Sequence, residues 1–168
     1  MKRVTRTAVG LAGAVAAAGV GLGVFIGSGV YNIGADDHHT RMVLALIEQL
    51  RDRSIGVRAR GLEVPDLDDA GRIAGGARHY ATLCVSCHLA PGVTKSDLRA
   101  GLYPHPPNLS QQEPRAARRE FWVVKHGIKM SAMPAWGKTL DDAAIWDIVA
   151  FVRRMPLMTP EAYQQLSR

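Results

Sequence analysis

The chain has 168 residues, enough for one domain with or without a membrane anchor, and its only two cysteines rule out a disulfide framework. The formal net charge is +6, with eight basic against four acidic residues in 1–60 and thirteen against eleven in 61–168. Because most of the basic excess lies near an apolar N-terminal segment, it indicates membrane topology and gives no reason to expect a nucleic-acid partner.

The first 35 residues predict a membrane anchor. Residues 7–33 contain no charged side chain, and about 20 apolar residues span a bilayer as a helix. The run is preceded by Lys2, Arg3 and Arg6. Basic residues of this kind stay in the cytoplasm, so the rest of the chain is expected to be exported. A cleaved signal peptide is the alternative, with the alanines at 16–18 as its cleavage site. Apolar sequence continues well beyond that site, which favours an uncleaved anchor.

Residues 36–67 are expected to form a juxtamembrane helix and a linker. The Asp36-Asp37 pair is expected to cap a helix over 38–54, in which apolar residues recur at helical spacing. These lie at positions 43, 46, 47 and 50. Such a helix would lie on the membrane surface, pack on the following domain or contact a partner. The adjacent His38-His39 pair has no third ligand nearby, so it is interpreted as polar boundary residues rather than a metal site.

Residues 68–168 predict one all-α domain. Asp68 or Asp69 is expected to cap a helix over 70–83, and the proline-rich stretch 89–114 shows no helical period. Further helices are expected over 113–126, over 140–155 and after Thr159. Between them lies a loop that contains Met130 and Met133.

The motif Cys84-Val85-Ser86-Cys87-His88 lies at the end of the helix expected over 70–83. Cys-x-x-Cys-His is the attachment site of a c-type haem. The two thiols form thioethers with the porphyrin, and the histidine becomes an axial ligand of the iron. A redox dithiol or half of a zinc site is the alternative, but a zinc ribbon would need a second cysteine pair. We therefore expect a single haem c, held through Cys84 and Cys87 with His88 on the iron.

Residues 68–156 resemble the class I cytochromes c, small monohaem proteins with His/Met ligation. Gly76, Tyr80 and Cys84 fall four apart, as in the entry helix of that family. The Ile145–Phe151 stretch looks like the last helix of the family, which crosses the entry helix, and the resemblance implies that the contact is made by Gly76, Tyr80 and Phe151. The resemblance thus implies a class I cytochrome c fold around one covalent haem. The chain departs from the family at Leu89, where glycine is frequent.

Two further segments carry the resemblance. Pro106-Pro107-Asn108-Leu109 is similar to the proximal Pro-Pro-x-Leu segment, which implies that the Pro107 carbonyl accepts the Nδ1 proton of His88. The stretch from Gly127 to Trp136 looks like the membrane-linked branch, in which the methionine of Met-Pro-Ala is the sixth ligand. That residue is Met133 here, and Tyr80 and Trp136 are expected to pack on the haem or in the core.

Chemistry alone leaves several candidates for the sixth ligand. They are His105, His126, Met130 and Met133. Met133 precedes a proline in a loop between two helices, a rigid place to hold a ligand, whereas Met130 is interpreted as a gap-filling side chain. His105 among prolines is interpreted as a surface residue, and His126 as a helix cap.

The function expected from these features is one-electron transfer by an anchored carrier and not enzymatic catalysis. The haem domain would lie in the periplasm of a bacterial inner membrane. It would exchange electrons with a dehydrogenase, a quinol-oxidising enzyme, a soluble cytochrome or a terminal oxidase. Two alternatives stay open: a haem enzyme with an open distal site, similar to a peroxidase or nitrite reductase, and a sensor or assembly subunit with a structural haem.

Overall fold

The computed structural model describes residues 2–168, and it divides into two compact units, Met1–Asp37 and His38–Arg168. The first unit contains α1, Lys2–Gly27, whose segment Thr7–Gly27 is long and apolar enough to cross a membrane. A signal sequence would have the same properties. The side chains of Lys2, Arg3 and Arg6, which carry the topology prediction, lie outside the described residues.

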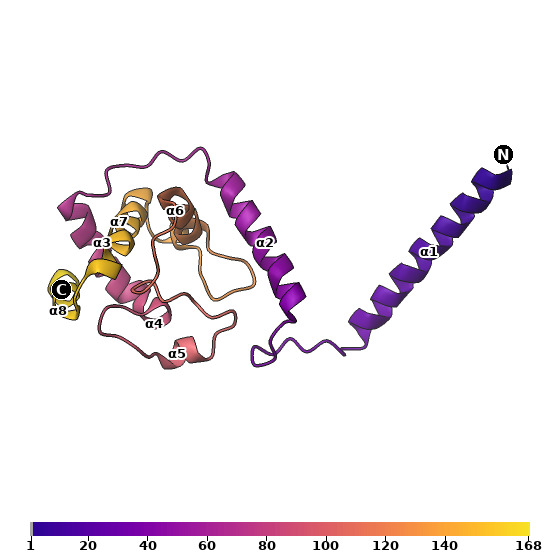
Figure 1. Ribbon diagram of the computed structural model, residues 1–168, viewed down its shortest axis with the longest axis horizontal. Coiled ribbons are helices and arrows are strands. Elements are labelled where there is room, and N and C mark those ends of the chain that lie inside the picture. The colour runs from indigo at the N-terminus through magenta and orange to yellow at the C-terminus, as the bar shows by residue number, and fades with distance from the viewer. Residues whose placement is uncertain (1) are drawn as a thin grey trace. The chain divides into compact units, whose positions relative to one another are not determined.

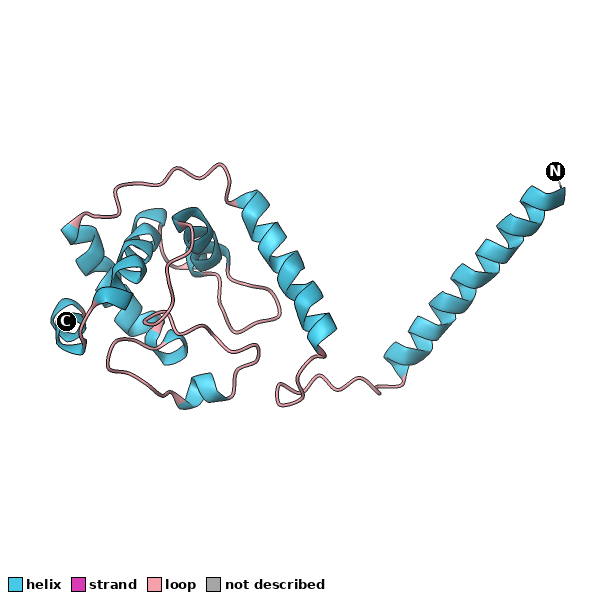
Figure 2. Ribbon diagram, viewed as in Figure 1, coloured by secondary structure: helices cyan, strands magenta, loops and turns pink. Residues whose placement is uncertain are grey.

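The second unit is helical, and no strand occurs among residues 2–168 (Figure 2). This confirms the all-α fold class. The α-helices are α2 Arg41–Arg58, α3 Ala70–Leu83, α4 Val85–His88, α5 Asp97–Ala100, α6 Ala117–His126, α7 Asp142–Arg154 and α8 Pro160–Leu166. Two short 3-10 helices, η1 Trp136–Lys138 and η2 Met155–Leu157, flank α7.

Side-chain caps explain where most of these helices begin. Asp69, Asp141 and Thr159 each accept a hydrogen bond from a backbone N–H in the first turn of α3, α7 and α8. The prediction that Asp36-Asp37 caps the next helix was wrong. Thr40 takes that role by accepting from the Val43 N–H, so α2 begins at Arg41.

Two other boundaries differ from the expectation. A single helical turn, α5, interrupts the stretch that was expected to have no helix, because Ser96 caps it by accepting from the Arg99 N–H. The helix expected from 113 begins only at Ala117. Glu120 accepts a hydrogen bond from the Arg115 N–H, which satisfies a backbone donor just before the first turn and fixes the start of α6.

The core of the second unit forms where α3 packs on α7 (Figure 1). At Gly76 a Cβ atom would lie 1.9 Å from the backbone oxygen of Asp147, so only glycine allows this approach of the two helices. Next to it, the rings of Tyr80 and Phe151 pack with centroids 5.2 Å apart, and both side chains are fully buried. These are the residues at which the family resemblance placed the helix contact.

A second apolar cluster joins α6 to α7. Phe121 and Trp146 stack with ring centroids 4.2 Å apart and an interplanar angle of 20°, and Ile145 and Val149 complete the cluster. This contact places the end of α6, and therefore the loop that follows it, against the α3–α7 core.

Helix α2 packs against α6, but through a different face from the expected apolar stripe. Leu46 and Leu50 are 60% and 73% exposed, whereas Ile55 is only 4% exposed. Of the three roles considered for this helix, packing on the following domain is the one that the second unit displays. The expected stripe is left without a covering element in the described part of the chain.

Candidate functional site

The Cys84–His88 motif folds as a single helical turn directly after α3. Cys84 ends α3 and begins α4, and its carbonyl accepts hydrogen bonds from the N–H groups of Cys87 and His88 at 3.1 and 2.8 Å. Residues three and four apart lie on one face of a helix. The turn therefore carries Cys84, Cys87 and His88 on the same side of the backbone.

Leu89 ends this turn in the left-handed region, with φ of 60°. Glycine is the residue that adopts this conformation without steric cost, which explains the glycine preference noted for this position. The turn forms here with leucine, whose side chain is 3% exposed. Its apolar burial offsets the strained backbone.

Tyr80 fixes the same turn from the side of α3. Its hydroxyl donates a hydrogen bond of 2.7 Å to the Leu89 carbonyl, in a fully buried position. Burial raises the pKa of Tyr80, with smaller contributions from Cys84 and Tyr163, so the hydroxyl keeps the proton that it donates.

Tyr80→Phe is expected to reduce the free energy of unfolding by about 1–2 kcal/mol, because it leaves the buried Leu89 carbonyl without its donor. The shape of the ring is retained, so packing on Phe151 is unchanged. Guanidinium denaturation followed by circular dichroism measures the effect. An unfolding midpoint equal to that of the unaltered chain would contradict the assigned role of this hydrogen bond.

His88 is oriented by the proline-rich segment. Its Nδ1 lies 3.0 Å from the Pro107 carbonyl oxygen, and its own carbonyl accepts from the Leu109 N–H. A carbonyl oxygen only accepts, so Nδ1 carries the proton and Nε2 keeps a lone pair for a metal. Desolvation lowers the pKa of His88 and outweighs the opposing effect of the Pro107 hydrogen bond, while the charge of Arg99 lowers it further. The ring is therefore neutral, as a ligand must be.

A cavity of about 350 Å³ lies beside these residues, within the usual range of small-molecule sites. Its wall includes Tyr80, Cys84, His88, Pro107 and Met133, which come from three separate segments of the chain. Much of the rest of the wall is apolar, from Leu109, Val123, Val124, Ile128, Ile148, Val149 and Val152. Five of the seven predicted site residues thus meet at one cavity. Cys87 and Trp136 are not among the described residues that line it.

Met133 is positioned by a tightly closed loop. Gly127 ends α6 with φ of 65°, and a Cβ atom there would lie 2.6 Å from the Met133 carbonyl oxygen. That carbonyl accepts from the Ile128 N–H at 3.1 Å, and the Met133 N–H donates to Ser131 Oγ at 3.2 Å. The Met133 carbonyl is therefore held beside the end of α6, and its N–H is held within the loop.

The other candidate ligands differ in position. Met130 is 100% exposed and has φ of 57°, and it does not line the cavity in the described structure. His126 is exposed and packs on Trp122 with ring centroids 4.8 Å apart. His105 does line the cavity, although its side chain is largely exposed. Met133 and His105 are thus the two candidates that reach the cavity.

The residues of this cavity fit a haem better than they fit a redox dithiol or a zinc site, the two alternative interpretations of the Cys-x-x-Cys-His motif. Burial, with a smaller contribution from Cys87, raises the pKa of the Cys84 thiol to about 12, whereas a redox dithiol requires a stabilised thiolate. Within residues 2–168, no group of three or more His, Cys, Asp or Glu side chains is placed to hold a metal ion. Both cysteines are free, and a largely apolar cavity that contains the neutral imidazole of His88 suits a porphyrin iron.

Comparisons with known proteins agree with this geometry. The family described as cytochrome C oxidase, cbb3-type, subunit III has a sequence model that matches residues 71–152. No significant match was found to a curated protein or to a solved structure. The matched segment runs from the start of α3 to near the end of α7 and includes the whole cavity wall except the part from α2. The segment 71–152 is therefore a class I c-type cytochrome domain, a domain that binds haem.

Proposed function

We propose that the chain is a membrane-anchored carrier that transfers one electron at a time through a single haem c. Cys84 and Cys87 would hold the haem through thioether bonds, and His88 and Met133 would be the ligands of its iron. The observation that carries the proposal is the meeting of His88, oriented by Pro107, and Met133 at one largely apolar cavity. The haem, when bound, supplies an iron that alternates between the ferric and ferrous states.

The residues of the chain determine how that iron behaves. Pro107 keeps the proton on Nδ1 of His88, so that Nε2 is left as the neutral donor that would bind the iron. The thioether of Met133 favours the ferrous state and raises the potential. With two protein ligands no coordination position is left for a substrate, which is the basis for proposing a carrier and not an enzyme. Tyr80 supports the proximal turn, and Trp136 begins η1, directly after the Met133 loop.

We infer the location and the partners, with support from the apolar helix and from the matched family. We assign 1–35 to the anchor, 36–67 to the juxtamembrane helix and linker, and 68–168 to the haem domain. The apolar Thr7–Gly27 segment supports anchoring in a bacterial inner membrane with the haem domain in the periplasm. The matched family supports redox proteins as partners, with an oxidase complex as one candidate and a dehydrogenase or quinol-oxidising enzyme as the others.

The test is to produce the full chain in a bacterium that matures c-type cytochromes and to purify it from the membrane fraction. We expect haem to stay with the polypeptide on a denaturing gel and to be lost from it in a Cys84→Ser/Cys87→Ser variant. We also expect a low-spin spectrum, no binding of carbon monoxide to the native ferrous protein, and a reversible one-electron titration.

Carbon monoxide binding or a high-spin spectrum in the native protein would instead support a haem enzyme with an open distal site. A chain that holds haem but exchanges electrons with a soluble cytochrome no faster than its ligand-free variant would support a structural haem. Either result would overturn the proposal of a carrier.

A further inference from the structure

Helix α2 precedes the matched cytochrome domain and yet forms part of the wall of the same cavity. Glu48, Arg51 and Ile55 of α2 line the cavity that His88 and Met133 also line. Ile55 is buried, which shows that this side of the helix is in close contact with the domain. The site therefore extends beyond residues 71–152.

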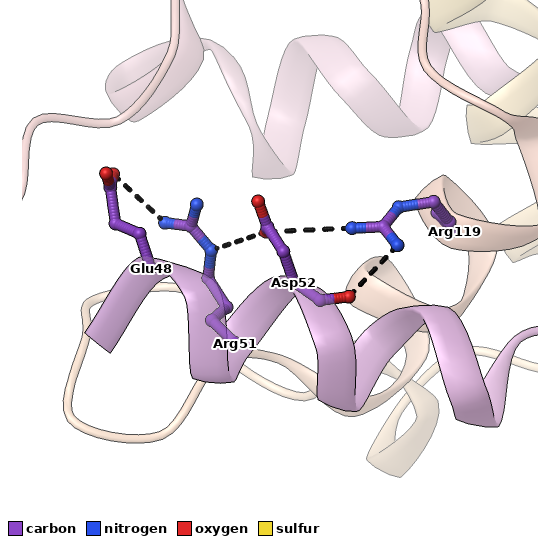
Figure 3. Close-up of polar contacts among 4 residues, drawn as sticks. All are labelled: Glu48, Arg51, Asp52 and Arg119. Carbon is purple, nitrogen blue, oxygen red and sulfur yellow. Dashed lines mark hydrogen bonds and ion pairs between the residues drawn. The ribbon is translucent and has the colours of Figure 1, made fainter. Parts of the chain in front are cut away.

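A network of ion pairs and hydrogen bonds holds α2 against α6 (Figure 3). Asp52 Oδ1 lies 3.0 Å from Arg51 Nε and 3.6 Å from Arg119 Nη2, and the Asp52 carbonyl accepts a hydrogen bond from Arg119 Nη1 at 3.1 Å. Arg51 also lies 3.6 Å from Glu48. Desolvation raises the pKa of Asp52, but the hydrogen bond from Arg51 and the charges of Arg51, Arg115 and Arg119 lower it overall. Asp52 is thus ionised, and it orients both guanidinium groups.

Three arginines, Arg51, Arg115 and Arg119, line the cavity together, and we call them the cationic rim. The guanidinium group of Arg115 has no hydrogen bond or ion pair in the described part of the chain. Arg51 and Arg119 use only some of their N–H donors within this network of ion pairs and hydrogen bonds. The rim therefore offers unused donors and positive charge to whatever occupies the cavity.

We propose that the cationic rim binds the two propionate carboxylates of the haem, so that α2 is a component of the haem site. This inference rests on the proposed function. Guanidinium groups form charge-assisted, often bidentate, hydrogen bonds to carboxylates. The rim lines the same cavity as His88 and Met133. A haem bound by these two ligands would therefore lie in the cavity that the rim also lines.

The rim is expected to act on the redox equilibrium. A cation beside the haem opposes the extra positive charge of the ferric state and so raises the potential. Other charged or titratable groups that line the cavity are Glu48, His105, Glu113 and Glu120, while Asp52 and Arg153 contact residues of the rim. Glu120 already accepts the Arg115 N–H and lies 3.7 Å from Arg153. Its Oε2 has no hydrogen-bond partner, and no ion pair joins it to a guanidinium group of the rim in the described structure.

The test compares Arg51→Gln with Arg53→Gln in the full-length, haem-loaded protein. Arg53 is exposed on the same helix and has no assigned partner, so its substitution removes the same formal charge. Arg51→Gln is expected to shift the ferric/ferrous ratio at a fixed ambient potential several-fold toward ferric, with about tenfold corresponding to about 59 mV. Arg53→Gln is expected to leave the midpoint potential close to that of the unaltered protein.

The pH dependence separates propionate binding from a purely structural role of α2. With the rim intact, both propionates stay ionised and the midpoint potential is expected to be nearly constant from about pH 5 to 8. Loss of Arg51 raises a propionate pKa, so the potential of Arg51→Gln should begin to fall as pH rises through that pKa. Ile55→Ala, which loosens α2 without removing charge, should not introduce this dependence.

Each outcome has a separate meaning. If the unaltered chain carries no covalent haem, the proposed function fails, and this inference fails with it. If the chain carries haem but Arg51→Gln matches Arg53→Gln in potential and in pH dependence, only the role of the rim is overturned. The same pH dependence in Ile55→Ala would assign the effect to exposure of the cavity and would also overturn it.

Discussion

Replacing Met133 with alanine is expected to lower the midpoint potential by on the order of 0.2 V, a fraction of the roughly 0.8 V that axial ligands span across haem proteins. The thioether stabilises ferrous iron, and alanine provides no donor to replace it. The near-infrared absorption of a thioether-bound ferric haem should disappear, and the ferrous protein should bind carbon monoxide. Redox titration and optical spectroscopy measure these changes.

Met130→Ala is the matched control, because Met130 belongs to the same loop, is fully exposed and does not line the cavity in the described structure. It should leave both the spectrum and the potential unchanged. If Met133→Ala kept the native spectrum while His105→Ala changed it, the sixth ligand would be His105, the other candidate at the cavity.

Gly76→Ala is expected to reduce the free energy of unfolding by about 3 kcal/mol or more, at the upper end of the cost of overpacking. The new methyl group would meet backbone atoms of α7, the Asp147 oxygen at 1.9 Å and the Ile148 nitrogen at 2.9 Å. Backbone atoms in a helix cannot rotate away, so α3 and α7 must separate along their whole contact. Chemical denaturation of the haem-loaded chain gives the value, and failure to accumulate folded protein is the extreme result.

Gly75→Ala is the control for helix propensity at the neighbouring position. Its Cβ would meet the end of the Asp147 side chain at 3.1 Å, and that side chain is paired with Arg72 at 2.7 Å. Alanine gains up to about 1 kcal/mol over glycine within a helix, which offsets the displacement of the carboxylate. The net change should therefore stay within about 1 kcal/mol. Equal losses in the two variants would contradict the importance of the Gly76 contact.

Local sequence signals predicted much of the fold because their causes are local. Asp69 and Thr159 cap α3 and α8 where the sequence placed them, and Gly127 ends α6. A side-chain cap involves residues three apart, so the sequence contains all of its parts. The contact of Tyr80 with Phe151 is distant in sequence, and only the family resemblance pointed to it.

The role of α2 was not predictable from its periodicity. The apolar positions predicted that the face with Leu46 and Leu50 would be buried, but both are exposed. The helix packs instead through Ile55, beside a network of ion pairs. The partner that decides this orientation is Arg119, which lies 67 residues after Asp52. Hydrophobic periodicity reports a stripe within one helix and contains no information about ion pairs to another. The cationic rim combines Arg51 of α2 with Arg115 and Arg119 near the start of α6, so it forms only when these distant segments pack together.

The closed loop between Gly127 and Met133 has a kinetic consequence. With Met133 as the proposed ligand, hydrogen bonds on both its carbonyl and its N–H hold its backbone in place, which limits how far the sulfur donor can move. A ligand that moves little gives a small reorganisation energy for electron exchange. The rate of turnover would then be set by encounter with the redox partner, and it should vary with ionic strength and solvent viscosity as an association step does.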